Sequence, residues 1–249
     1  MIKLGTRGSL LARTQSGHVA DLIRTQLGRE VEMVTVSTHG DRSSAPLATL
    51  GGTGVFVSAL REALLDGSID VAVHSMKDLP TQPADGIALA AVPTREDSRD
   101  ALVARDGLTL SELPAGSSIG TGSPRRAAQL HALGMSFDVR EIRGNVDTRI
   151  GKLRAGEVDA IVLAMAGLRR LGREDEVSFT FGLDEMTPAA GQGSLVVQTR
   201  TGGAQSTGAP AIDDDASNRE LRAERAAVVG LEADCSSPVG IHARHKGDV

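Results

Sequence analysis

Two similar stretches of sequence decide the fold of this chain. Residues 67–73 read Gly67-Ser68-Ile69-Asp70-Val71-Ala72-Val73, and residues 156–162 read Gly156-Glu157-Val158-Asp159-Ala160-Ile161-Val162. Each stretch follows an amphipathic helical pattern and leads into a short apolar run that is typical of a buried strand. Chance agreement over so few residues is the alternative interpretation. The repeat suggests two similarly wound α/β halves.

Helices and strands alternate around the first stretch. Ser9 begins a helical pattern that ends at Gly28, and apolar residues recur at helical spacing again in residues 55–66. The predicted strands of this half are residues 2–5, 31–37, 70–74 and 87–92. Strands that alternate with helices form βαβ units, so we expect a doubly wound, mostly parallel sheet.

Two segments connect this half with a second one that has the same pattern. Residues 93–100 are charged and rich in turn formers, and residues 187–193 precede a further strand at 195–199. Two crossings between α/β lobes form a hinged cleft, the architecture of type II periplasmic binding proteins. We assign residues 1–94 plus 190–202 to lobe 1 and residues 95–189 to lobe 2.

The remaining residues predict a small third piece. Residues 201–216 are rich in Gly, Ala, Ser, Thr and Asp, which is typical of a linker. Residues 218–231 then form a helix with Leu221, Val228 and Leu231 on its apolar side. Residues 215–249 are too few for an independent core, so we expect a partial α+β domain there, incomplete at its end.

Composition excludes several classes of function. The formal net charge is −5, whereas general nucleic-acid binding needs a basic face. The chain has no Trp, no Tyr and four Phe, so aromatic stacking platforms for single-stranded nucleic acid are not expected. No apolar run approaches the ~18 residues of a membrane span, and a signal-peptide pattern is not found at the start. We expect a cytoplasmic protein that binds neither nucleic acid nor membrane.

Basic side chains follow the predicted strands repeatedly. In doubly wound sheets, ligands bind beyond the carboxyl ends of the strands. The segments at these ends are Arg7, His74-Ser75-Met76-Lys77-Asp78, Thr121-Gly122-Ser123-Pro124-Arg125-Arg126, Arg143-Gly144-Asn145 and, one turn further on, Arg149. The pattern predicts an anion-binding cleft.

The turn at residues 121–126 carries the strongest physical signal. Ser123 is a good N-cap and Pro124 fits the first helical position. A helix start carries roughly half a positive charge, so Arg125 and Arg126 are unfavourable there unless an anion binds. The alternative is that both arginines are solvated or pair with a neighbouring acid. If they bind an anion, leucine at either position should weaken ligand binding and leave the fold intact.

The chemistry of these side chains indicates the ligand class. The guanidinium fork of arginine binds both oxygens of a carboxylate, so several converging arginines predict a ligand with several carboxylates. Neither a Walker-type loop nor a Gly-x-Gly-x-x-Gly turn follows a strand, which disfavours nucleotides. Asp78 is an acid within this basic neighbourhood: it either forms a structural ion pair or stabilises positive charge in a reaction. The histidines do not form a metal set.

Cys235 is the single cysteine of the chain. One thiol cannot form an internal disulfide, so it is either buried and inert or kept because it reacts.

Taken together, these segments resemble the porphobilinogen deaminase (hydroxymethylbilane synthase) family. The resemblance runs in order from residue 2 to residue 240 and rests on Gly5–Ser9, His74–Pro80, Thr121–Arg126, Arg143–Arg149, Ala166–Leu168 with Arg170, Pro188–Gly193, and Leu231–Gly240 around Cys235. It implies an enzyme that joins four porphobilinogen molecules head to tail, with loss of ammonia, into hydroxymethylbilane. It also implies a cytoplasmic monomer with a dipyrromethane cofactor bound through a thioether to Cys235.

The resemblance also implies roles for individual residues. Asp78, with Lys77 and Arg7, would carry the catalysis. The residues implied for cofactor binding are Cys235, Ser75, Lys77, Asp78, Thr121, Ser123, Arg125, Arg126, Arg143 and Gly144. Those implied for substrate binding are Arg7, Ser9, Gln15, Arg149, Arg170 and Gln192.

Three departures from the family pattern accompany the resemblance. Thr49 and Thr53 stand where many members have lysines. Asp234 precedes the cysteine in place of the common glycine, and its charge should raise the pKa of the thiol. The third domain of the family continues well beyond the cysteine, so the chain resembles a truncated member. The rival function is a non-catalytic bilobed binding protein for small polycarboxylates, which has no use for Cys235 or Asp78.

Overall fold

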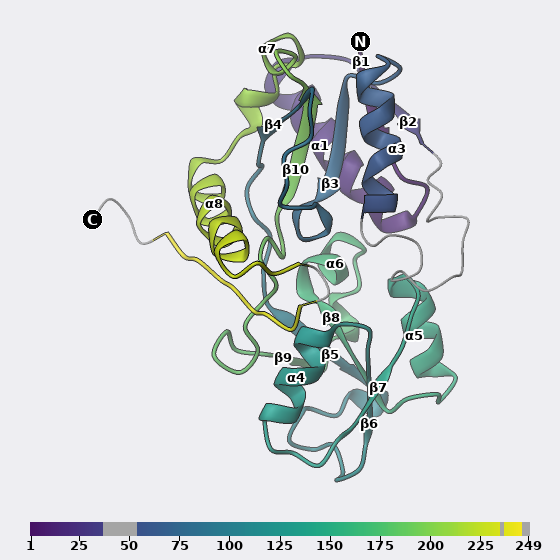
Figure 1. Ribbon diagram of the computed structural model, residues 1–249. Helices are drawn as coiled ribbons and strands as arrows, with labels where there is room; N and C mark the ends of the chain where they lie inside the picture. The colour runs from purple at the N-terminus through teal and green to yellow at the C-terminus, as the bar shows by residue number, and fades with distance from the viewer. Residues whose placement is uncertain (37–53, 235–236, 246–249) are drawn as a thin grey trace.

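The computed structural model describes residues 1–36, 54–234 and 237–245, and it contains two sheets in two lobes (Figure 1). Each sheet has five strands, and helices cover both faces of each. None of the helices in these ranges is long and apolar enough to cross a membrane. The fold is the predicted pair of α/β lobes.

The first sheet has the strand order β2-β1-β3-β10-β4. Its strands are β1 (Ile2–Thr6), β2 (Val31–Thr35), β3 (Val71–Ser75), β4 (Ile87–Ala91) and β10 (Leu195–Arg200). β1 runs parallel to β2 and β3, whereas β10 is antiparallel to both β3 and β4. Helix α1 (Leu10–Leu27) packs on one face through Val19 and Ile23, and α3 (Gly54–Leu65) packs on the other through Leu60 and Leu64. The core of this lobe therefore has two layers, one on each side of the sheet.

The second sheet has the order β7-β6-β8-β5-β9. Its strands are β5 (Asp100–Ala104), β6 (Ser118–Thr121), β7 (Asp138–Glu141), β8 (Ala160–Ala164) and β9 (Phe179–Thr180). β6 is parallel to β7 and β8, and β5 is antiparallel to β8 and β9. Its helices are α4 (Pro124–Ala132), α5 (Val146–Arg154) and α6 (Met165–Arg170). The short 3-10 turns of the chain are η1 (Met76–Asp78), η2 (Arg105–Gly107), η3 (Glu174–Glu176) and η4 (Ala209–Ile212).

The chain leaves the first sheet after β4 and returns to it as β10, as the two predicted crossings require. The crossings lie against each other, since the amide of Glu96 donates to the carbonyl of Gly193 at 3.3 Å. Gly193 has a φ of 90°, and a Cβ at this position would lie 2.2 Å from the Glu96 carbonyl oxygen. A side chain on residue 193 would therefore force the crossings apart.

The predicted helix boundaries are confirmed where capping residues mark them. The Ser9 hydroxyl accepts from the amide of Ala12, and Gly28 ends α1 with a φ of 60°. The Ser123 hydroxyl accepts from the amide of Arg126, with Pro124 as the first helical residue. Local sequence chemistry alone fixes these ends.

The prediction of a linker at residues 201–216 is wrong. This segment forms the short helix α7 (Ala204–Thr207) and η4, and Ala209 and Ile212 are buried in the core beside α1. Small side chains allow the segment to pack closely against the lobe, which composition alone does not reveal. Helix α8 (Asp215–Gly230) begins earlier than predicted and is capped by Asp214, and Leu231, expected on its apolar side, follows the helix and is 60% exposed.

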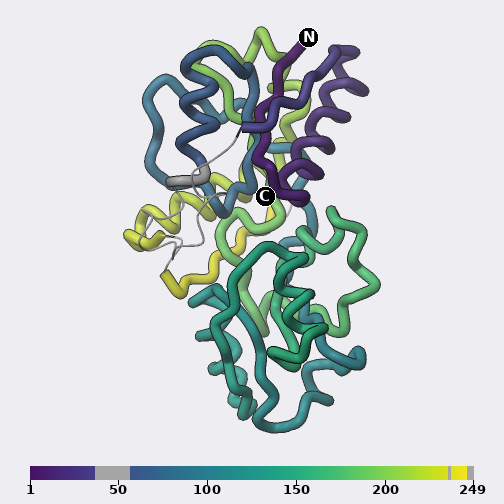
Figure 2. The backbone as a smooth tube through the Cα atoms, turned by 90° about the vertical axis from the view of Figure 1, so that its right-hand side faces the viewer, coloured from purple at the N-terminus to yellow at the C-terminus, as the bar shows by residue number. Residues whose placement is uncertain are grey.

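A fully buried carboxylate connects α8 to both crossings. Glu224 accepts from Arg95 at 2.7 and 3.1 Å, from the amide of Gly191 at 2.6 Å and from the amide of Ala243 at 2.9 Å. Figure 2 shows the yellow C-terminal segment at the level where the two lobes meet. α8 and residues 241–245 are therefore anchored where the lobes join.

Candidate functional site

The carboxyl ends of the parallel strands carry the predicted basic residues. In the first lobe, Arg7 follows β1, and Lys77 and Asp78 lie in η1 directly after β3. In the second lobe, Thr121 ends β6, Arg143 follows β7, and Arg170 ends the short helix after β8. These ends of the two sheets are where a ligand of a doubly wound fold binds.

Lys77 of the first lobe lies near the charge of Arg126 in the second lobe. Its side chain is half-buried, and its pKa is lowered to about 8, chiefly by burial and then by the charge of Arg126. Asp78 and Asp100 oppose this shift but do not cancel it. Lys77 of the first lobe therefore lies within electrostatic reach of the arginines of the second, and the carboxylate of Asp78 beside it is exposed.

The arginines of the 121–126 turn converge on one buried acid. Asp100 is fully buried and accepts from Arg126 Nε at 3.0 Å and Nη2 at 2.7 Å, while Arg125 Nη2 lies 2.8 Å from its other oxygen. Burial alone would raise the pKa of Asp100, but the charges of Arg126 and Arg125 hold it below its ordinary value. Arg126 also donates to the carbonyl of Val162, and Arg125 to that of Thr187.

This arrangement corrects one expectation from the sequence. Pairing with a neighbouring acid, the alternative for Arg125 and Arg126, is present in the structure. Both arginines are almost fully buried, so leucine at position 126 would leave part of the Asp100 charge uncompensated. The structure therefore argues against the expectation that such a change leaves the fold intact, and thermal unfolding of the variant decides between the two.

Arg149 also lies within electrostatic reach of Arg126. Burial lowers its pKa, and the charges of Arg126 and Arg143 lower it further. Its Nε donates to the carbonyl of Gly144 at 2.8 Å. Gly144 has a φ of 117°, and a Cβ there would lie 2.6 Å from the Cβ of Thr148. Arg143 itself is exposed, and its guanidinium group pairs with the carboxylate of Glu141 at 2.6 Å.

Arg170 and Gln192 lie at the crossings. Arg170 donates to the carbonyl of Gly193 at 2.6 Å, and burial lowers its pKa. Gln192 donates to the Ser98 carbonyl and to Asp100, but its Oε1 is buried without a hydrogen-bond partner. The Gln192 side chain is thus fixed with one acceptor unused.

The first lobe contributes a second group of cations. His74 is buried, and its pKa is lowered to about 3 by burial and by the charges of Arg61 and Arg7. His74 is therefore neutral, and Arg7 and Arg61 lie close to it. Ser9 serves as the cap of α1, and Gln15 is buried on that helix.

Three of the residues discussed from the sequence fall in segments that the structure does not describe. Cys235, Thr49 and Thr53 lie outside the described residues. The residues on either side of Cys235 and Ser236 are described, and the Ser237 hydroxyl donates to the Asp234 carboxylate at 3.1 Å.

Several polar residues at the centre of the molecule were not predicted from the sequence. They are Asp100, Arg95, Glu224 and Arg61. Glu224 had a detectable signal, because it lies on the same helix face as Leu221 and Val228, where an apolar residue is expected. Asp100 had none, since it stands among other charged residues at the predicted crossing.

The arrangement as a whole favours anions with several negative groups. Lys77 and Arg149 both lie close enough to Arg126 for its charge to lower their pKa. Like charges that lie near one another are stabilised when carboxylates bind beside them.

Comparison with known proteins gives a family and a fold. Residues 2–207 match the family described as "Porphobilinogen deaminase, dipyromethane cofactor binding domain". Porphobilinogen deaminase of Mycobacterium tuberculosis (strain ATCC 25618 / H37Rv) is 55% identical over 241 residues, which is 96% of this chain and 77% of the relative. Porphobilinogen deaminase 1 of Streptomyces coelicolor is 52% identical over 244 residues, covering 96% of this chain and 76% of the relative.

The similar solved structures are bilobed binding proteins. A methionine-binding protein, MetQ, has a TM-score of 0.52 at 13% identity over 98% of both chains. A nutrient-binding protein from Burkholderia cenocepacia bound to methionine has a TM-score of 0.52 at 14% identity, over 93% of this chain and 96% of its own. At this identity the likeness establishes the type II periplasmic-binding-protein fold alone.

Proposed function

This chain belongs to the porphobilinogen deaminase family, and from that premise we propose how its residues divide the work of the reaction. The reaction joins four porphobilinogen molecules head to tail into hydroxymethylbilane with release of ammonia, on a dipyrromethane cofactor. The binding-protein alternative is set aside, because its only support is a fold likeness below 25% identity.

The residues at the strand ends fit the cofactor. A dipyrromethane carries acetate and propionate side chains, and cationic side chains suit carboxylates. When bound, the cofactor supplies the free pyrrole carbon to which the first porphobilinogen is joined. We assign it to Ser75, Lys77, Asp78, Thr121, Ser123, Arg125, Arg126, Arg143 and Gly144, with a thioether to Cys235. The proximity of Lys77 in the first lobe to Arg126 in the second is the observation that carries this assignment.

Each coupling step must stabilise a positive charge. The C–N bond of the protonated aminomethyl group of porphobilinogen breaks, ammonia leaves with the bonding electron pair, and the remaining pyrrole is cationic. A C–C bond then forms to the free pyrrole carbon of the growing chain, and that carbon loses its proton. We assign Asp78 to the stabilisation of this cation, because it is an exposed carboxylate beside Lys77.

Lys77 and Arg7 complete the catalytic group. Both cations would hold substrate carboxylates so that the reacting carbons meet near Asp78. The substrate would further contact Ser9, Gln15, Arg149, Arg170 and Gln192. The unused buried acceptor of Gln192 supports its place in this list, since a pyrrole N–H or an ammonium group could donate to it.

The lobes have distinct contributions under this proposal. Lobe 1, residues 1–94 plus 190–202, supplies Asp78 and Lys77, and lobe 2, residues 95–189, supplies the arginines of α4 and α5. Residues 215–249 form the third unit and present Cys235. The two separate sheets and the shared crossings support this division. We further assign the chain to the cytoplasm as a monomer.

Intact-protein mass spectrometry tests the proposal. The chain expressed with porphobilinogen available should carry an added mass equal to two pyrrole units, and Cys235→Ser should lack it because a hydroxyl is a far weaker nucleophile. Ser237→Ala is the matched control, since it changes a neighbour of the loop and keeps the thiol. An adduct that persists in Cys235→Ser would refute the assignment of Cys235.

A further inference from the structure

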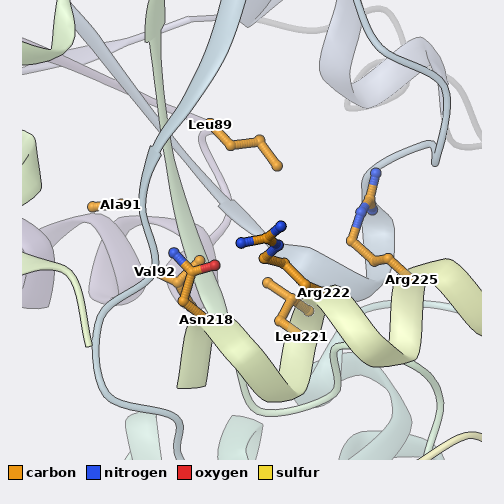
Figure 3. A pocket seen from close by; sticks show the side chains of 7 residues that line it. All are labelled: Leu89, Ala91, Val92, Asn218, Leu221, Arg222 and Arg225. Carbon is orange, nitrogen blue, oxygen red and sulfur yellow. The ribbon is translucent and has the colours of Figure 1, made fainter. Parts of the chain in front are cut away.

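A cavity of about 380 Å³ lies between the edge strand β4 and helix α8. Figure 3 shows its lining: Leu89, Ala91 and Val92 from the strand side, and Asn218, Leu221, Arg222 and Arg225 from the helix. None of these residues belongs to the site assigned above. The cavity is therefore separate from the catalytic cleft.

The walls of this cavity have two chemical characters. Leu89, 50% exposed, contributes an apolar surface together with Val92 and Leu221. The guanidinium groups of Arg222 and Arg225 give the lining its cationic part, with Arg222 at the centre of the view below Leu89 and Arg225 to the right (Figure 3). An apolar body with negative groups at one end would satisfy both sides.

The cationic side has uncompensated charge. Within the described part of the chain, neither Arg222 nor Arg225 has a carboxylate within salt-bridge distance. The amide nitrogen of Asn218 donates to the carboxylate of Asp213 at 3.0 and 3.1 Å. Burial lowers the pKa of Arg225, and the charge of Arg61 lowers it further. A bound carboxylate would relieve this repulsion.

Arg225 also connects the cavity to the catalytic turn. Its Nη2 donates to the carbonyl of Pro80 at 2.9 Å and its Nη1 to that of Leu79 at 3.4 Å. These carbonyls belong to the two residues that follow Asp78 in the chain. A carboxylate that draws Arg225 into the cavity would compete with these hydrogen bonds and release the turn that positions Asp78.

We propose that this cavity is a second, non-catalytic site for a small amphipathic dicarboxylate, which lowers turnover by withdrawing Arg225 from the turn that follows Asp78. The apolar body packs against the apolar part of the lining, which includes Leu89, and the two carboxylates pair with Arg222 and Arg225. The proposal rests on the deaminase activity only for its kinetic consequence, because binding is measured without turnover.

Binding of phenylsuccinate to the primer-loaded chain is the first test. Calorimetry should give saturable binding to the parent and at least about tenfold weaker binding to Arg222→Gln, because one carboxylate loses its partner. Arg219 lies on the same helix but does not line the cavity, so Arg219→Gln should bind phenylsuccinate like the parent. Uncharged phenylsuccinamide should not bind. Saturable binding that Arg222→Gln leaves unchanged would place the probe elsewhere, and absence of saturable binding would equally overturn the proposal.

Kinetics with porphobilinogen are the second test. Phenylsuccinate should lower kcat of the parent and leave KM unchanged, whereas Arg222→Gln should keep its parent-like basal activity and resist the inhibitor. Inhibition that raises KM alone would mean that the probe competes in the catalytic cleft, which would refute the coupling through Arg225. A chain without deaminase activity that still shows Arg222-dependent binding would refute the proposed function and leave the second site standing.

Discussion

Replacing Arg126 by leucine should destabilise the protein by about 3 kcal/mol, because it leaves a buried acid short of its main partner. Asp100 has 0% exposure and accepts two of its hydrogen bonds from Arg126, at 2.7 and 3.0 Å. Removing one member of a buried ion pair costs roughly 3–5 kcal/mol. The lower end applies here, since Arg125 remains 2.8 Å from Asp100 and Gln192 still donates to it.

Thermal unfolding followed by circular dichroism measures this loss, since the chain has no Trp and no Tyr for fluorescence. A loss of this size lowers Tm by roughly 6–12 °C in a protein of this length. Arg154→Leu is the control: its pair with Glu176 is 67% exposed on the arginine side, so the change should cost less than about 1 kcal/mol. An Arg126→Leu variant within about 0.5 kcal/mol of the parent, the range of ordinary surface changes, would refute the reasoning.

The pH dependence gives a second check. Because the folded pKa of Asp100 is depressed, its contribution to stability is present above the unfolded carboxyl pKa of ~3.9 and is lost as the pH falls through the folded value. Arg126→Leu removes part of that depression. The stability difference between variant and parent should therefore shrink as the pH falls through the carboxyl range, and Asp100→Asn added to Arg126→Leu should recover part of the loss. A difference that does not change with pH would point to packing instead of charge.

Three further changes test the site and its anchoring. Asp78→Asn should keep the fold and the primer but lose about a hundredfold or more in turnover, and a variant within about threefold of the parent would make Asp78 structural. Because the pKa of Lys77 is about 8, its charge is lost as the pH rises through that value, and KM for porphobilinogen should rise there. Lys77→Arg should remove this rise of KM at alkaline pH, because arginine keeps its charge. If KM of Lys77→Arg depends on pH as that of the parent does, the assignment is contradicted. Glu224→Gln should make α8 and residues 241–245 more susceptible to limited proteolysis, because the charge-assisted hydrogen bond to Arg95 is lost. Glu232 is exposed, so the control variant Glu232→Gln should be digested like the parent.

The parts of the fold that were predictable are those that local chemistry dictates. Ser9, Gly28 and Ser123 mark helix ends because caps depend on a few neighbouring atoms, and the alternation of apolar runs gives the two α/β lobes. The pairing of Asp100 with two arginines could not be predicted, because it joins β5 to α4 across the interior of a lobe. Residues 201–216 were misread for a related reason: Ala209 and Ile212 are too few to give a periodic signal, yet tertiary packing buries both.

The place of β10 within the first sheet has a consequence for biosynthesis. β10 lies between β3 and β4, although about a hundred residues separate it from β4 in the chain. On the ribosome, the whole second sheet is made before β10 emerges, so that lobe can fold from a contiguous segment. Until residues 195–200 arrive, β3 and β4 each present an unpaired edge to other nascent chains. We therefore expect the sheet of the lobe that carries Asp78 to be completed after the second sheet has been made.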